Sequence, residues 1–365
     1  MVMTAETRST AGQGHERHRG VGMALLAALL FGVSAPFAKL LLRGTAPQLL
    51  AGLLYLGSGA GLALVWLGRR HSTDVAREAS LTHRDLPWLA GAIAFGGGLG
   101  PLLLMVGLTR TPASSASLLL NLEGVFTALL AWFVFRENFD RRIALGMVAI
   151  VAGGVVLSWE GALAWGGVAG TLAVASACLC WAIDNNLTQK VSAGDPVQIA
   201  MLKGLVAGAV NTAIALALGA PWPALPRLGS TVLLGFLSYG VSLVLFVLAL
   251  RHLGTARTGA YFSTAPFVGA AVSLVVFRER PTALLVAAAA LMALGVWLHL
   301  TERHEHEHAH EALEHEHPHV HDEHHQHAHA PGDPPGEPHS HQHRHEPLVH
   351  THPHYPDIHH RHGHD

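Results

Sequence analysis

Three ionisable residues interrupt long apolar segments of this 365-residue chain. Glu123 lies about halfway along one apolar run, and Asp184 and Lys203 lie near the same end of two consecutive runs. A charge near the centre of a bilayer costs roughly 3 kcal/mol or more on insertion scales, so it tends to face a cavity or a partner. Glu123 therefore fits a proton or cation site that alternates between protonated and ionised states. A structural carboxyl bonded to a neighbouring helix is the alternative.

Asp184, Asn185 and Asn186 form a polar group near the end of the sixth apolar run. Asp184 and Lys203 are placed to pair as a gate that breaks when one side of the protein opens. The alternatives are a static interfacial ion pair, or a Lys203 side chain that extends its ammonium group toward the membrane surface. Lys39, near the end of the first run, is expected to extend in the same way rather than to contact a solute.

Small and polar residues form a stripe on the fourth run, because Ser114, Ser117, Asn121 and Gly124 follow helical spacing. Such a stripe either lines a pathway or permits close helix packing, for which membrane helices favour small residues. The predicted pathway and coupling residues are Ser117, Asn121, Glu123, Asp184, Asn185, Lys203, Tyr239, Tyr261 and Ser263.

Histidines concentrate in residues 302–365, which hold 23 of the 29 in the chain. Imidazole suits Zn, Ni, Co and Cu, and alternating His-X-His spacing lets several rings reach one ion. Binding requires neutral rings, so affinity should fall below about pH 6.5. The predicted ligands are His304, His306, His308, His310, His315, His317, His319, His321, His324, His325, His327 and His329. No cofactor is otherwise expected.

The tail has almost no apolar runs and contains the Pro-rich segment 331–338, so it is predicted to be disordered. Its irregular final stretch argues against an engineered tag. Cys178 and Cys180 lie in one apolar run and are too close on a helix to bridge easily, so they predict no disulfide framework.

The rest of the chain is far more apolar than a soluble domain. Only 13% of all residues are charged, against about 25% in soluble domains. Ten runs approach the roughly 20 residues that a membrane-spanning helix needs. They are 21–42, 47–67, 87–108, 113–135, 143–159, 166–188, 197–218, 229–250, 256–277 and 281–300. Basic residues are few and scattered, which argues against nucleic-acid binding. The sequence shows no nucleophile–base pair that would suggest an enzyme. It also shows no P-loop, so transport driven directly by ATP is not expected.

Loop charges predict the orientation. With the N-terminus in the cytoplasm, the inside segments hold fourteen Lys and Arg residues and the outside segments hold five. This asymmetry favours the cytoplasmic N-terminus, and ten spans then return the His-rich tail to the cytoplasm.

An internal repeat divides the apolar part. The sequence VFRE occurs at 134–137 and again at 276–279, 142 positions apart, and the same offset relates Gly98 to Gly240 and Gly153 to Gly295. Five spans is an odd number, so two five-span copies must insert in opposite orientations, as in many secondary transporters. Glycines and Pro101 interrupt the third run, and LSYGVSL (237–243) is its repeat partner. Matched interruptions indicate a solute site, or close packing by glycine.

These segments resemble the EamA-type family of the drug/metabolite transporter superfamily. The resemblance rests on GLTRTPASSASLL (107–119) with its VFRE, ALRHLGTARTGAYF (249–262) with its VFRE, FGVSAPFAK (31–39) and WAIDNNLTQK (181–190). It covers about residues 21–300, and the tail lies outside it. The first copy departs from the second, having Glu123-Gly124 where the second has Ala265-Pro266. The resemblance implies ten helices in two inverted repeats and transport of small metabolites, without naming the solute.

The sequence therefore predicts an all-α integral membrane protein with ten transmembrane helices and a disordered His-rich tail. The expected parts are a cytoplasmic segment (1–20), two five-helix repeats (21–160 and 161–301) and the tail (302–365). The expected function is export of a small metabolite or drug-like solute across the inner or plasma membrane, with both termini cytoplasmic. The alternatives are an exporter of Ni, Co or Zn, or a membrane-anchored metal-binding or sensing protein. The expected partners are the lipid bilayer, a small-molecule solute and transition-metal ions, and a homodimer is left open.

Overall fold

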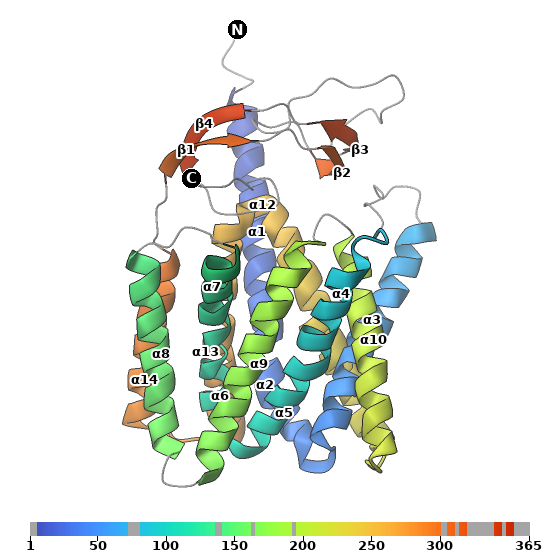
Figure 1. The fold of residues 1–365 in the computed structure, drawn as a ribbon, viewed down its shortest axis with the longest axis vertical. Coiled ribbons are helices and arrows are strands. Elements are labelled where there is room, and N and C mark those ends of the chain that lie inside the picture. The colour runs from blue at the N-terminus through green and yellow to red at the C-terminus, as the bar shows by residue number, and fades with distance from the viewer. Residues whose placement is uncertain are drawn as a thin grey trace.

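The computed structural model describes residues 6–71, 81–135, 141–161, 165–191, 195–300, 305–310, 314–319, 339–344 and 348–353. Up to Leu300 the described residues form a bundle of long helices that lie roughly side by side (Figure 1). The helices of the first half are α1 (Glu6–Gly32), α2 (Ser34–Leu41), η1 (Leu42–Gly44), α3 (Pro47–His71), α4 (Leu86–Ala92), η2 (Ile93–Leu99), α5 (Gly100–Arg110), α6 (Ala113–Leu119), α7 (Leu122–Phe135) and α8 (Arg141–Gly161). Those of the second half are α9 (Trp165–Gln189), α10 (Pro196–Ala217), α11 (Leu225–Gly235), η3 (Phe236–Val241), α12 (Ser242–Phe262), α13 (Ala265–Phe277) and α14 (Ala283–Leu300).

Seven helical stretches among the described residues are long and apolar enough to cross a membrane. They are Arg19–Gly44, Pro47–Arg69, Leu86–Arg110, Ala113–Leu130, Val168–Thr188, Pro196–Ala217 and Leu225–Ala249. Three shorter apolar helices, Ala144–Leu157, Ala265–Phe277 and Ala283–Leu298, lie where the fifth, ninth and tenth runs were predicted. The chain is thus a multi-pass membrane protein, and the count of ten spans remains a prediction.

The outer surface agrees with a lipid environment. Large apolar side chains on α8, α13 and α14 point outward, among them Val148 (65% exposed), Val155 (56%) and Val275 (78%). Inside the bundle, alanine and leucine from many helices form one large cluster that includes Leu50, Leu104 and Leu119. Apolar residues therefore occupy both the interior and the rim, as expected where the solvent is hydrocarbon.

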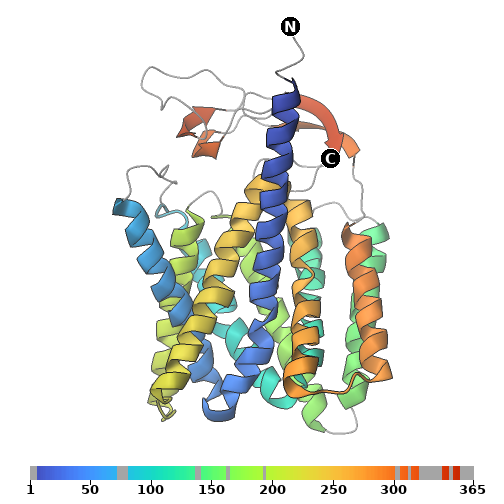
Figure 2. The ribbon, with the colours of Figure 1, turned by 180° about the vertical axis from the view of Figure 1, so that it is seen from behind.

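Helix α12 differs from the sequence prediction, which placed a connection between residues 250 and 256. The backbone is helical without a break through this segment. However, the rings of Phe246 and Phe262 lie only 4.8 Å apart, whereas a straight helix would separate them by about 24 Å. The run must therefore bend back on itself. Its first leg completes the predicted eighth run and its second leg begins the ninth, which α13 continues toward the opposite end (Figure 2).

Glycines bring two pairs of helices into close antiparallel contact. On α3 and α10, a side chain on Gly52 would collide with Thr212, and one on Gly59 would collide with Leu205. The partner number falls as the position along α3 rises, so the two helices run in opposite directions.

Helices α8 and α14 show the same relation with an added symmetry. Gly153 faces Ala288 and Met292, while Gly295 faces Gly146 and Ile150. Each residue of the first contact lies 142 positions from its counterpart in the second. The two helices are therefore antiparallel, and exchanging one for the other reproduces the contact.

Irregular backbone occurs at matched places in the two halves. Residues 93–99 (η2) and 236–241 (η3) form π-helical segments, and turns at 120–121 and 263–264 interrupt the helices that follow. These pairs agree with the 142-residue offset to within one or two positions. π-helical segments are rare and are often found at functional sites.

The described parts of the tail form strands at the end of the bundle where α1 begins (Figure 1). Strand β1 (Glu305–His310) pairs antiparallel with β4 (Leu348–Pro353), and β2 (Glu314–His319) pairs with β3 (His339–Arg344). The expectation of disorder therefore does not describe these four segments. A reason lies in the alternation of histidine with other residues, which has the two-residue period of a strand.

Candidate functional site

Asp184 on α9 and Lys203 on α10 form a largely buried ion pair. The lysine Nζ lies 2.6 Å from Oδ1 and 2.7 Å from Oδ2 of the aspartate, and the two side chains are 8% and 12% exposed. Thr188 donates to Oδ1 at 2.8 Å and accepts from Nζ at 3.2 Å. The predicted pairing is therefore present, and it joins two helices that follow each other in the chain.

The ion pair lies against the π-helical segment η2. A side chain on Gly96 would occupy the space of the Asp184 carboxylate. Only glycine at this position lets the carboxylate approach the backbone of the third span. The glycine-rich sequence of this span therefore serves a close contact with a charged group, in addition to helix packing.

Side chains from three other helices bind the carbonyl oxygens of η2. Tyr55 on α3 donates to Gly96 O at 2.8 Å, and Trp181 on α9 donates to the same oxygen at 3.0 Å. The Nδ2 atom of Asn211 on α10 donates to Gly97 O and Gly98 O at 3.3 and 3.2 Å. Pro101 has no N–H to offer the carbonyl of Gly97, four residues earlier. An amide from a neighbouring helix replaces that missing donor.

Glu123 lies in the first turn of α7 and is partly exposed although it is in the middle of the fourth span. Its Oε1 accepts a hydrogen bond from Nδ2 of Asn185 at 2.8 Å. It also interacts electrostatically with Asp184 and Lys203, and Tyr55 in turn interacts with Glu123 and Asp184. The predicted groups Glu123, Asp184 and Lys203 thus lie together on α7, α9 and α10, and Tyr55 of α3 joins them.

Aromatic rings continue this group toward the second π-helical segment. The ring centroids of Tyr55 and Tyr239 are 5.5 Å apart, and those of Phe31 and Tyr239 are 6.0 Å apart in an edge-to-face arrangement. Phe31 also lies 5.4 Å from Phe262. Tyr55 therefore contacts both segments, through its hydroxyl at η2 and through its ring at η3. All four rings are partly exposed.

Other predicted residues lie elsewhere. Ser117 is 1% exposed and packs against Gly269 of α13. Asn121 is 6% exposed, and its amide donates to Leu118 O and approaches Met292 Sδ at 3.9 Å. Both therefore support the turn between α6 and α7 and its packing, which agrees with close packing as the interpretation of the small-residue stripe. Tyr261 packs with Ala24 and Ala249, and Ser263 lies in the turn between α12 and α13.

Six residues of the site were not predicted from the sequence: Phe31, Tyr55, Trp181, Thr188, Asn211 and Phe262. Asn211 was detectable in principle, because an amide within an apolar run needs a partner. The aromatic residues give no such signal, since membrane helices also carry them at interfaces and in cores. Their roles depend on which helix they face.

The predicted metal ligands carry no described side-chain geometry. His306, His308 and His310 lie in β1, and His315, His317 and His319 lie in β2. The remaining predicted ligands, His304, His321, His324, His325, His327 and His329, lie outside the described residues. Within the described part of the chain, no group of three or more His, Cys, Asp or Glu is placed to hold a metal ion. Cys178 instead contacts the carbonyl of Leu119 at 3.6 Å.

Comparison with known proteins agrees with this architecture. The model of the EamA-like transporter family matches residues 18–159 and again 168–301. An uncharacterized transporter of Methanothermobacter thermautotrophicus is 31% identical over 272 residues, which are 70% of this chain and 78% of that protein. A solved crystal structure with 20% sequence identity matches 78% of this chain and 97% of its own, with a TM-score of 0.57. At that identity the structural likeness concerns the fold alone.

Shorter matches involve a lipid-linked sugar flippase. A protein of Pseudomonas paraeruginosa described as a probable 4-amino-4-deoxy-L-arabinose-phosphoundecaprenol flippase subunit ArnE is 39% identical over 115 residues. The match covers 31% of this chain and 96% of that subunit. The corresponding protein of Pseudomonas fluorescens is 47% identical over 70 residues, covering 19% of this chain and 58% of the subunit.

Proposed function

Because the chain belongs to the EamA-like transporter family, we propose that it is a secondary transporter which exports a small metabolite or drug-like solute by alternating access. The two halves rock about a site near the middle of the membrane. The antiparallel pairing of α8 with α14 and of α3 with α10 supports two inverted five-helix repeats. The matched π-helical segments support a solute site between them, because transporter sites form where membrane helices are interrupted.

The Asp184–Lys203 pair against η2 is the observation that carries this proposal. A buried ion pair is stable only while both partners stay together, because separating them leaves an uncompensated charge. A rearrangement of α9 relative to α10 would separate them at a large cost unless water or a solute enters. The pair therefore acts as a gate on the side where α9 ends and α10 begins.

Glu123 is the coupling residue of the proposal. It is partly exposed, and its only described hydrogen-bond partner is the neutral amide of Asn185. The one lysine nearby, Lys203, already pairs with Asp184. A carboxylate without a cationic partner in a water-accessible space can exchange a proton or a cation as the space opens on alternate sides.

Reconstitution into liposomes tests the coupling. The probes are amino acids, nucleosides, aminosugars and a lipid-linked aminosugar, the last because of the matches to ArnE subunits, with an internal pH dye. We expect wild-type flux to follow an imposed pH gradient and Glu123→Gln to lose that dependence. Asn185→Ala is the matched control, since it keeps the carboxylate and removes only its partner. A Glu123→Gln variant that responds to the gradient as the wild type does would refute the coupling role.

The His-rich tail is proposed to bind transition-metal ions and to regulate transport by the membrane part. The strand register supports this, because it places His opposite His at 306/352, 308/350, 315/343, 317/341 and 319/339. Directly opposite residues in an antiparallel pair have Cβ atoms about 5 Å apart, a spacing from which two imidazoles can share one ion. The alternatives are a dedicated exporter of Ni, Co or Zn and a metal sensor that carries no solute.

Deletion of residues 302–365 separates these alternatives. If the tail is an accessory, solute flux survives and binding of Ni or Zn is lost. Metal efflux from loaded vesicles that stops on deletion favours the metal exporter. Absence of flux for every solute, with the tail present and metal bound, favours the sensor. Metal binding itself should weaken between pH 7 and 5.5, since imidazole protonates near pH 6.5.

A cytoplasmic location for both termini completes the proposal. The structure supports it in part, because α1 begins at the same end of the bundle as the described tail strands (Figure 2). Single cysteines at Arg84 and Arg227, on opposite ends, test the side. A membrane-impermeant maleimide added to intact cells should label the second and not the first.

A further inference from the structure

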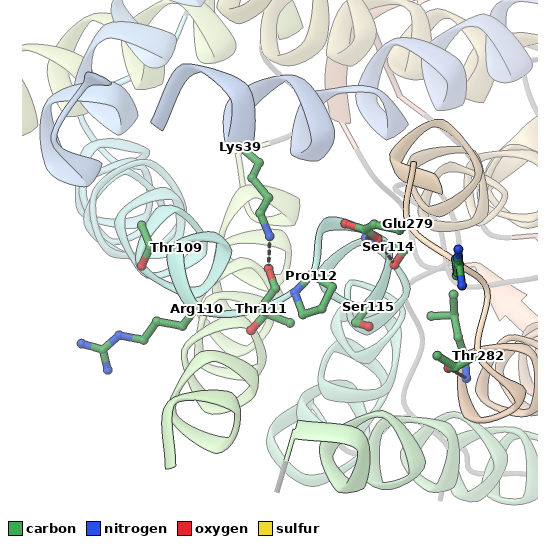
Figure 3. A pocket seen from close by; sticks show the side chains of 11 residues that line it. Lys39, Thr109, Arg110, Thr111, Pro112, Ser114, Ser115, Glu279 and Thr282 are labelled. Carbon is green, nitrogen blue, oxygen red and sulfur yellow. Dashed lines mark hydrogen bonds between the residues drawn. The ribbon is translucent and has the colours of Figure 1, made fainter. Parts of the chain in front are cut away.

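A cavity of about 510 Å³ lies among elements that meet at the end of the bundle opposite the start of α1 (Figure 1), and Figure 3 shows it from close by. It lies between the end of α2, the end of α5, the start of α6 and the connection from α13 to α14. The charged and hydroxyl-bearing residues of its lining include Lys39, Arg110, Ser114, Ser115, Glu279 and Arg280. The volume falls within the range of small-ligand pockets. The cavity shares no residue with the Asp184–Lys203 site.

The lining carries three cationic side chains and one acidic one. The carboxylate of Glu279 is already engaged, because it accepts from Ala113 N at 3.2 Å, from Ser114 N at 3.3 Å and from the Ser114 hydroxyl. Arg110 and Arg280 are exposed, and neither has an ion pair among the described residues. The cavity therefore has an excess of positive charge that the described side chains do not balance.

Lys39 is the least exposed of the three cations. Its ammonium group donates to the carbonyl of Thr111, which ties α2 to the connection before α6 (Figure 3). That acceptor is neutral, and one hydrogen bond leaves two of the three donors of an ammonium group for a ligand. An ionised ligand would bind these donors more strongly than the carbonyl does, because charge-assisted bonds are about twice as strong.

The segment that supplies Glu279 and Arg280 has an unusual backbone. Arg278 ends α13 with φ 52° and ψ 36°, and it is the single non-glycine residue of the described chain in the left-handed region. This conformation is less favourable for arginine than for glycine. It turns the chain sharply so that Glu279 reaches α6 and the next residue lines the cavity. Strained residues often lie at ligand sites.

From the charge balance and hydroxyl-rich lining of this cavity, we propose that it binds a phosphate group. Three cations and one acid give an excess of two positive charges, which matches a phosphate monoester at neutral pH. The guanidinium groups match phosphate oxygens in geometry, and the hydroxyl of Ser115 has no described partner and is available to donate. The phosphate belongs to a soluble solute or to a lipid headgroup. Binding at Lys39 weakens its bond to Thr111 and so favours opening at this end. This effect on opening rests on the proposed transport function, whereas phosphate binding does not.

Binding measurements on the full-length protein in nanodiscs test the site. In phosphatidylcholine discs, inorganic phosphate and glycerol 3-phosphate should bind saturably by calorimetry. Arg280→Gln should weaken binding by about fivefold, since one charged contact is lost. Glu279→Gln should tighten it, because the substitution removes the one acid. Arg227→Gln is the matched control: Arg227 contacts Gly44 O, does not line the cavity, and should leave affinity unchanged.

The two sources of phosphate are separated by lipid composition. If phosphatidic acid in the discs, whose headgroup is a phosphate monoester, displaces inorganic phosphate, and Arg280→Gln removes the effect, the ligand is a headgroup. If it does not, the ligand is a soluble solute. Absence of saturable phosphate binding together with absence of competition by phosphatidic acid would overturn the proposal. Equal affinity in Arg280→Gln, Glu279→Gln and Arg227→Gln would overturn it as well.

These outcomes are independent of transport. Phosphate binding without flux of any solute would contradict the proposed function and leave the site in place. Flux without phosphate binding would support the proposed function and contradict the phosphate site.

Discussion

The two π-helical segments share their backbone irregularity and differ in what surrounds them. Segment η2 is contacted by the Asp184–Lys203 ion pair. It also accepts hydrogen bonds from the indole N–H of Trp181, the amide of Asn211 and the hydroxyl of Tyr55. Segment η3 is bordered by rings, since its own Tyr239 contacts Phe31 and Tyr55 and Phe236 lies against Gly61. The duplication thus kept the interruption of the helix, while the surroundings of η2 acquired charge and those of η3 acquired aromatic rings.

This difference gives the two segments different expected roles: η2 controls opening and η3 adapts to it. An interrupted helix frees backbone carbonyls, which must find donors inside the membrane. At η2 the donors come from neighbouring helices, so any movement of α9 or α10 is linked to the third span. At η3 the contacts are mainly between rings, which slide past one another at a lower cost. We therefore expect the charged surroundings of η2 to control opening and the aromatic surroundings of η3 to adapt to it.

Breaking the ion pair should have the largest effect on this asymmetry. Lys203→Met leaves the buried Asp184 carboxylate without a counter-charge, which costs about 3 kcal/mol or more. The melting temperature in detergent should fall clearly, and flux should be lost. The double variant Asp184→Asn/Lys203→Met should recover most of the stability. If the single variant melts like the wild type, the pair does not hold α9 to α10.

Adding a methyl group beside each π-helical segment tests the difference directly. Gly96→Ala places a Cβ in the space of the Asp184 carboxylate, and such overpacking typically costs about 1–3 kcal/mol. Gly240→Ala, at the matched region of η3, meets only side-chain atoms at 3.3–3.5 Å. It should be near neutral in the same thermal melt. Equal losses in both variants would contradict the proposed asymmetry.

Removing the amide that binds η2 should have an intermediate effect. Asn211→Leu keeps the size of the side chain but leaves the carbonyls of Gly97 and Gly98 without this donor, at a cost of about 1.5 kcal/mol. Asn186→Leu is the control, because its amide bonds a carbonyl of its own helix, Ala182 O. Hydrogen exchange of residues 93–99 should increase in Asn211→Leu alone. No change there would show that water satisfies these carbonyls.

The smallest expected effect concerns the residue that contacts both segments. Tyr55→Phe keeps the ring contact with Tyr239 and removes the hydrogen bond to Gly96 O, which is worth about 1 kcal/mol. The melting temperature should fall slightly. The rate of solute flux should change more than in Tyr261→Phe, because Tyr261 lies away from η2. A Tyr55→Phe variant identical to the wild type in both measurements would remove Tyr55 from the site.

Much of the fold was predictable from particular residues. The apolar runs located the helices, and VFRE with Gly153 and Gly295 revealed the repeat that the antiparallel α8–α14 contact now reproduces. Glu123, Asp184, Asn185 and Lys203 were predictable because a polar side chain in an apolar run needs a partner. Ser117 and Asn121 were not separable from packing residues, since small polar side chains suit both a pathway and a close helix contact. The reversal between the eighth and ninth runs was predicted, but not the helical backbone of α12 through it, because its residues favour helix on both sides.

The sequence by itself determined that this protein lies in a lipid bilayer, where its helices are along the chain, and that they are duplicated. These follow from composition and periodicity, because transfer into hydrocarbon depends on each residue's own side chain. Only the tertiary structure decided which polar groups meet. Asn211 and Gly97 are 114 residues apart, and Tyr55 and Gly96 are 41 apart. Their contacts depend on the rotation of each helix about its axis, where one residue changes the direction by about 100°. That rotation is set by the neighbouring helices and cannot be derived from any one run alone.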